Sequence, residues 1–210
     1  MQKRQWLLWI GVPALIFFSI LLYLLLSGRQ QAKAVEQQVV RFHVVAHSDT
    51  PEDQELKLKV RNGVFALLKE LFSSCGSQAE ALSVAKAHRG ELEEAAQRIL
   101  EENGSSASVE LQVGERFFPT KTYGSLSFPA GSYQAVSLRI GEAKGQNFWC
   151  VLYPALCLSP AVAAEEAEAE MAVAIGEKGL SFLKKADEKQ KIRFALVEWF
   201  EIFIEKYLKS

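Results

Sequence analysis

Hydrophobic residues follow helical spacing at both ends of this chain and alternate with polar residues in its middle. The first hydrophobic stretch, Trp6 to Leu26, contains no charged residue. About 20 apolar residues suffice to cross the hydrocarbon core of a bilayer, so this stretch predicts a membrane-spanning or signal helix. Amphipathic helices are predicted over residues 51–72 and 78–102, and a last one over residues 189–208.

Strands are predicted on both sides of the two central helices. A β-prone apolar run precedes them, and three alternating or aromatic-rich runs follow them. These four runs span residues 39–45, 109–113, 133–140 and 148–153. We therefore expect a small α+β domain with a mostly antiparallel sheet. A helical hairpin and a C-terminal helix would pack on this sheet, and the N-terminal hydrophobic helix would precede it.

The turn between the first strand and its helix carries several agreeing signals. Ser48-Asp49-Thr50-Pro51 is rich in turn-forming residues. Thr50 suits the N-cap position, Pro51 suits the first helical position, and Asp53 lies where the acid of a capping box would reach back. Asp49 and Asp53 could instead form a carboxylate pair for acid–base catalysis. Capping already accounts for them, and it is the favoured interpretation.

Two blocks of the chain resemble the signatures of a known family. RFHVVAHSDTPEDQELKLKVRNGV, residues 41–64, is similar to the N-terminal signature of stage II sporulation protein R. FPAGSYQAVSLRIGEAKGQNFWCVLYPALC, residues 128–157, resembles the second signature of that family, in the same order along the chain. One departure is His47, where the family usually has Asn, so His43 and His47 should not be treated as a paired family site.

The resemblance implies a role and not a reaction. It implies an exported signal, made in the forespore, that acts between the forespore and mother-cell membranes of endospore-forming bacteria. There it would activate a membrane-bound aspartic protease, which processes the precursor of sporulation sigma factor E. No cofactor, metal or small-molecule substrate is expected. The alternatives are an extracytoplasmic hydrolase acting on cell wall, with His43, Asp49 and Asp53 in its site, and a membrane-tethered structural protein.

Three segments are expected along the chain. Residues 1–34 would be a signal peptide or signal anchor, 35–158 the α+β signalling domain and 159–210 a helical C-terminal extension. Ala32-Lys33-Ala34 has the small-x-small form of a cleavage site, but the apolar run is longer than a usual signal-peptide core. Cleavage and retention both stay open. The membrane is expected as a partner in either case, through the N-terminal segment.

Charge excludes nucleic acid as a partner. Residues 35–210 carry 25 acidic and 20 basic side chains. A nucleic-acid-binding domain normally carries a basic patch or stripe. The lysine and arginine residues that cluster locally fall on predicted helices, where solvated helix faces explain them.

Few residues have a pattern that supports catalysis or metal binding. His43 and His47 could share a zinc ion if they lay one helical turn apart, but their segment is predicted as a strand and the Glu of an H-E-x-x-H motif is absent. Ser48 lacks the Gly-x-Ser-x-Gly context of a nucleophile. We therefore expect residues that contact a partner or organise its binding site. The candidates are His43, Ser48, Asp49, Asp53, Gln54, Arg61, Phe128, Pro129, Gly131, Asn147 and Trp149.

Two features of the second block leave alternatives open. The aromatic run that contains Trp149 could serve as an interface anchor or as core, since both uses are common. Cys150 and Cys157 flank a short segment with Pro154 between them, which permits a disulfide in an exported protein. Buried free thiols are the alternative. Cys75 is expected to be free.

Overall fold

The structure is a computed structural model that describes residues 2–154, 164–184, 195, 198–199 and 202. The predicted helix over 189–208 and Cys157 therefore lie outside the described residues, apart from four isolated positions of that helix. The described elements, in chain order, are α1 (Gln2–Glu36), β1 (Val40–Val45), α2 (Pro51–Leu71), α3 (Gln78–Ala87), α4 (Arg89–Glu102), β2 (Val109–Phe118), β3 (Lys121–Tyr123), β4 (Leu126–Phe128), β5 (Gly131–Ile140), β6 (Asn147–Tyr153) and α5 (Ala164–Leu183).

The central sheet has the strand order β2-β5-β1-β6. Strand β1 pairs in parallel with β5 and antiparallel with β6, and β2 pairs antiparallel with β5. Because β1 lies between two strands and both sheet faces are covered, all six of its residues are buried. This explains why Val40, Phe42, Val44 and Val45 are apolar. The two polar residues of the strand, Arg41 and His43, are buried as well and hydrogen-bond to other parts of the protein. The α+β prediction with a mostly antiparallel sheet is confirmed.

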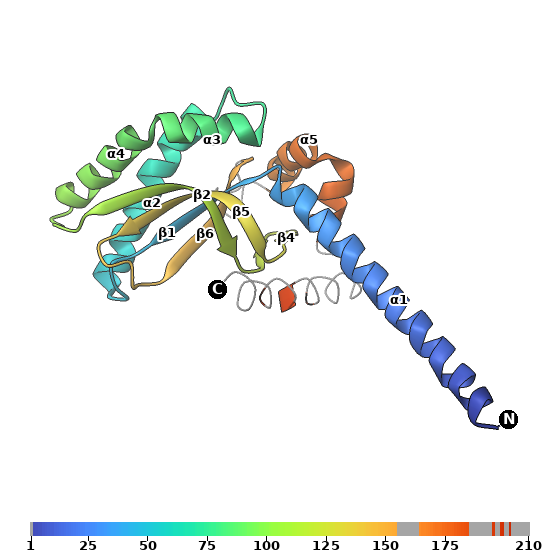
Figure 1. The fold of residues 1–210 in the computed structure, drawn as a ribbon. Coiled ribbons are helices and arrows are strands. Elements are labelled where there is room, and N and C mark those ends of the chain that lie inside the picture. Colours follow the sequence, from blue (N-terminus) through green and yellow to red (C-terminus); the bar gives the residue numbers. More distant parts are fainter. Residues whose placement is uncertain (1, 155–163, 185–194, 196–197, 200–201, 203–210) are drawn as a thin grey trace.

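Helices α2, α3 and α4 cover one face of the sheet (Figure 1). Side chains of β1 that point to this face, Phe42 and Val44, are completely buried against the apolar sides of the helices. The spacing of Val60, Val64 and Leu68 on α2 supplies the matching stripe. This first core fixes where the N-terminus of α2 meets the sheet.

The opposite face is covered by the end of α1, the β3–β4 hairpin and α5, which form a second core. Glu168 of α5 links the helix to the hairpin because it accepts a hydrogen bond from the Ser125 hydroxyl and pairs with Lys184 at 2.8 Å. Residues 164–183 thus belong to the packed domain. Gly176 interrupts α5, since this residue has φ 69° inside the helix.

One predicted helix is wrong in its extent. Residues 78–102 form two helices, because the chain leaves helical geometry at His88, which caps the end of α3 and the start of α4. His88 holds Glu91 of the next turn through Nδ1 at 2.8 Å. The apolar spacing continues across the break, so the hydrophobic pattern does not reveal it.

Candidate recognition site

The predicted N-cap and first helical position of α2 are confirmed, but the Thr50 amide donates to the Ser48 hydroxyl at 3.2 Å and not to the Asp53 carboxylate that a capping box would use. Thr50 is the N-cap residue, and its hydroxyl accepts a hydrogen bond from the Asp53 amide at 3.3 Å. Pro51 occupies the first helical position. The Asp53 carboxylate accepts from the Ser48 hydroxyl at 2.5 Å, and so it closes the turn through a side chain. Asp53 is therefore engaged in local structure at the positive end of the helix.

The same corner holds the β5–β6 loop. Asp49 accepts a hydrogen bond from the Gln146 amide at 2.7 Å, and Lys57 donates to the Gln146 carbonyl at 3.0 Å. Gln54 donates to the Ser48 carbonyl at 2.8 Å and accepts from Lys57 at 2.6 Å. We call Ser48, Asp49, Asp53, Gln54, Lys57 and Gln146 the α2 corner. Its polar groups tie the helix start to this loop.

Lys57 is an unusual member of the α2 corner because its side chain is buried. Burial lowers the pKa of Lys57, the positive charge of Arg61 lowers it further, and the negative charge of Asp49 raises it. Its ammonium group donates to two neutral oxygens, so hydrogen bonds offset part of the desolvation of the charge. The Lys57 ammonium group thus links the start of α2 to the β5–β6 loop.

His43 lies on the other face of the sheet from the α2 corner. Its ring stacks on Trp149 at a centroid distance of 3.9 Å and an interplanar angle of 9°, and it meets the edge of Phe118 at 6.2 Å. His43 Nε2 is 2.7 Å from the side-chain oxygen of Asn147. We call His43, Asn147 and Trp149 the histidine–tryptophan stack. Asn147 directly follows Gln146, so the β5–β6 loop joins the stack to the α2 corner.

The environment of His43 keeps its ring neutral. Burial lowers the pKa of His43 from 6.5 to about 4, the hydrogen bond with Asn147 opposes this, and the positive charges of Arg116 and Arg139 add to the lowering. The unfolded chain therefore binds a proton at a higher pH than the folded chain does. The contribution of the neutral His43 ring to the stability of the fold is therefore fully present above pH 6.5, and it is lost as the pH falls from 6.5 towards 4.

We expect the free energy of unfolding to fall by about 3 kcal/mol between pH 7.5 and pH 4 through His43 alone. In His43→Phe the ring can still stack but cannot take up a proton, so this part of the pH dependence should disappear. Urea unfolding of both proteins at the two pH values measures it. An equal loss of stability in the variant and the unmodified chain would contradict this assignment.

The other predicted residues divide into exposed and buried groups. Arg61 lies over the ring of Phe148 at 4.5 Å, on the helix side of the sheet. Phe128, Pro129 and Gly131 are buried beneath the second core, so in this state they can organise a binding surface but cannot touch a partner. Asn147 is exposed and Trp149 is half-buried. Of the candidates in the second block, Asn147 and Trp149 are therefore the ones that a partner can reach.

The residues named for a hydrolase do not come together. His43 contacts Asn147, Trp149 and Phe118, whereas Asp49 and Asp53 bind the Gln146 amide and the Ser48 hydroxyl on the helix side. His47 accepts from the Glu142 amide at 3.0 Å and helps to hold the turn after β5. Within the described ranges, no three His, Cys, Asp or Glu side chains lie close enough to hold a metal ion.

The cysteines differ in state. Cys150 is disulfide-bonded in β6, and Cys75 is a free thiol in the turn after α2. Cys157 lies outside the described residues, so its pairing with Cys150 stays a prediction. Burial and the charge of Glu80 both raise the pKa of Cys75, which makes this thiol a poor nucleophile near neutral pH.

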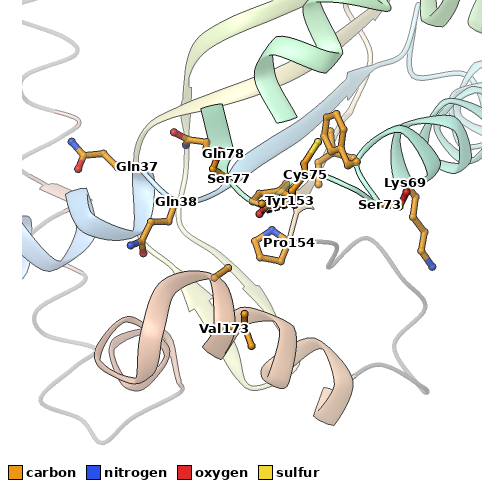
Figure 2. Close-up of a pocket in the computed structure, with 14 residues that line it drawn as sticks. Gln37, Gln38, Lys69, Ser73, Cys75, Ser77, Gln78, Tyr153, Pro154 and Val173 are labelled. Carbon is orange, nitrogen blue, oxygen red and sulfur yellow. Dashed lines mark hydrogen bonds between the residues drawn. The ribbon is translucent and has the colours of Figure 1, made fainter. Parts of the chain in front are cut away.

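A cavity of about 700 Å³ lies between the end of α1, the α2–α3 turn, the end of β6 and α5 (Figure 2). Gln37, Gln38, Gln78 and Tyr153 give it a polar side, and Val173 gives it an apolar one. The α2 corner and the histidine–tryptophan stack contribute none of its lining. The sequence contains no motif that points to this cavity.

Arg41 was also missed as a candidate residue. It is completely buried, and its guanidinium lies 4.5 to 5.7 Å from the centres of four aromatic rings, those of Phe118, Tyr123, Phe128 and Tyr133. It donates to the Cys150 carbonyl at 3.1 Å and to the Tyr123 hydroxyl at 3.0 Å. A charged residue inside an apolar strand was the available signal, because such residues are rarely buried without a dedicated environment.

Comparison with known proteins gives concordant results. The family model described as stage II sporulation protein R matches residues 36–163, more than half of the chain and a range that includes every predicted site residue. Stage II sporulation protein R of Bacillus subtilis (strain 168) is 28% identical over 214 residues, which cover 88% of this chain and 96% of that relative. No solved structure matches.

Proposed function

Because this chain belongs to the stage II sporulation protein R family, we propose that it is an exported sporulation signal that activates a membrane-bound aspartic protease. The protease, in the mother cell, then processes the precursor of sporulation sigma factor E. The signal acts between the forespore and mother-cell membranes. Membership of the family supports a role in sporulation, whereas export, activation of the protease and processing of the precursor are our proposal.

Activation by contact, without a reaction on the signal itself, is supported by how the candidate side chains are used. Asp49, Asp53 and Lys57 make hydrogen bonds that build the fold, and the His43 ring is covered by Trp149. None of these contacts pairs a nucleophile with a base, as covalent catalysis requires. An exposed Asn beside a half-buried Trp is instead typical of an interface anchor with a polar rim.

The proposed contact surface consists of Asn147, Trp149 and the exposed side of the α2 corner. The corner fixes the β5–β6 loop from one side and the histidine–tryptophan stack fixes it from the other. A loop held in one conformation loses little entropy on binding. The signal would shift the protease towards its active state by binding that state more tightly than the inactive one.

Deletion of the gene tests this role. Processing of the sigma factor E precursor should stop in sporulating cells that lack the chain and return when the gene is restored. Immunoblotting of the precursor and its product through sporulation measures it. Unchanged processing in the deletion strain, with the deletion verified, would contradict the proposed function.

A further inference from the structure

The last turns of α1 are built into the folded domain. Gly28, Ala32 and Val35 are buried, and their spacing of four and three residues places them on one side of α1; Val39, just after the helix, is buried as well. Ala32, Val35 and Val39 are 2%, 1% and 0% exposed in the second core. The hydrophobic helix and the domain thus share a core.

Polar contacts fix the junction as firmly as the packing does. The Gln78 amide at the start of α3 donates to the carbonyls of Glu36 at 2.8 Å and Val39 at 2.6 Å. The Glu36 carboxylate lies so close to Gly131 that a Cβ atom added at position 131 would come within 2.1 Å of it. The connection between α1 and β1 is therefore a clamped turn, and it differs from a flexible linker.

The free part of α1 is suited to a bilayer. Exposed apolar side chains continue along it to Leu26, and residues 11–36 contain an 18-residue window with a mean hydropathy of 2.1. Leu26 precedes Ala32 by six residues, which is about 9 Å along a helix. Figure 1 shows α1 projecting from the domain with the domain packed around its last turns. A bilayer around α1 would meet the domain almost directly.

We propose that α1 is retained in the mature chain as a structural anchor and holds the domain against the membrane surface. The small-x-small sequence Ala32-Lys33-Ala34 lies inside α1, and the Ala32 side chain is in the second core. A protease would have to unfold these turns before it could bind them. Loss of residues 1–34 would also remove Ala32 and its turn from a core that they help to fill.

Retention also sets which part of the domain lies nearest the membrane. Gln37 and Gln38 follow α1 directly and form one wall of the cavity in Figure 2, opposite Val173 of α5. An anchored domain would therefore present this cavity at the membrane surface. A membrane-embedded partner could reach it without leaving the bilayer.

The mass and location of the wild-type chain give the first test. The full chain, with a C-terminal tag, is produced in a bacterium that exports it, and the tagged protein is analysed by membrane fractionation and intact-mass spectrometry. We expect the full-length mass in the membrane fraction, resistant to salt and alkaline extraction. A soluble product that begins after Ala34 would overturn the proposal.

A matched pair of substitutions gives the second test. Ala32→Asp and Ala34→Asp both alter the small-x-small sequence, but Ala32 is buried whereas Ala34 is exposed. For the full chain in detergent we expect Ala32→Asp to lower the Tm by roughly 10 °C and Ala34→Asp by less than about 2 °C. Both variants should have the full-length mass, changed only by the substitution itself.

Two outcomes of the paired test would overturn the proposal. One is a mass that exceeds that of the wild-type chain by more than the substitution itself adds, since it shows that a cleavage was blocked. The other is an equal effect of the two substitutions on the Tm. If Ala32→Asp does not fold, Val35→Ala replaces it, with an expected fall of roughly 5 °C, against the exposed Lys33→Ala as control.

Discussion

Replacement of Arg41 by alanine should lower the free energy of unfolding by about 3 to 5 kcal/mol. The side chain is completely buried among four aromatic rings that come from β2, β3, β4 and β5. Its removal leaves a cavity between these rings and takes away the donors to the Cys150 carbonyl and the Tyr123 hydroxyl. Both effects act on the second core.

Thermal and urea unfolding of the full chain in detergent measure this loss. The control is Arg139→Ala, since Arg139 is a neighbouring strand residue with 41% side-chain exposure and a distant ion pair of 3.9 Å to Glu110. That substitution should cost less than about 1 kcal/mol. A similar loss in both variants would show that burial among the rings does not stabilise the domain as described.

Trp149→Ala should abolish most of the signalling activity. An anchoring Trp at an interface typically contributes about 2 kcal/mol or more, which is roughly a 30-fold change in affinity. Trp149 also supports the start of β6, because it stacks on His43 at 3.9 Å and His43 in turn bonds to Asn147, directly after the β5–β6 loop. Precursor processing in a deletion strain that carries the variant measures the effect.

A control is needed because Trp149→Ala could reduce processing by lowering the stability of the fold and not by removing a contact with the protease. Phe65→Ala removes a partly buried aromatic side chain from the helix-covered core, far in sequence from the proposed surface. It should lower stability while processing continues at a temperature where both variants stay folded. Equal processing by Trp149→Ala and the unmodified chain would contradict a contact role for Trp149.

The sequence predicts those parts of the fold that depend on neighbouring residues. The cap at Thr50, the Pro51 start and the apolar stripe on α2 are local, and all three are confirmed. The strands were found because β-prone residues cluster there, although the hairpin of β3 and β4 was not. Its strands have three residues each, which is too short for a periodic signal.

The arrangement of the site depends on contacts between distant segments, which a local pattern cannot supply. His43 and Asp49 are close in the chain, yet strand alternation points His43 to one sheet face while the turn carries Asp49 to the start of α2. The partner of Asp49 comes from the β5–β6 loop and that of His43 from the start of β6, both about 100 residues later in the chain. Lys57 and Arg41 acquire their roles only through such contacts.

The central claim is that the chain activates the protease by contact through the surface around Trp149. It is tested most directly by producing the full chain, the protease and the sigma factor E precursor together in a bacterium that does not sporulate, and measuring the processed precursor. We predict processing only when the chain is present, and little processing with Trp149→Ala. Processing that needs no chain, or that proceeds fully with the folded Trp149→Ala variant, would contradict this claim.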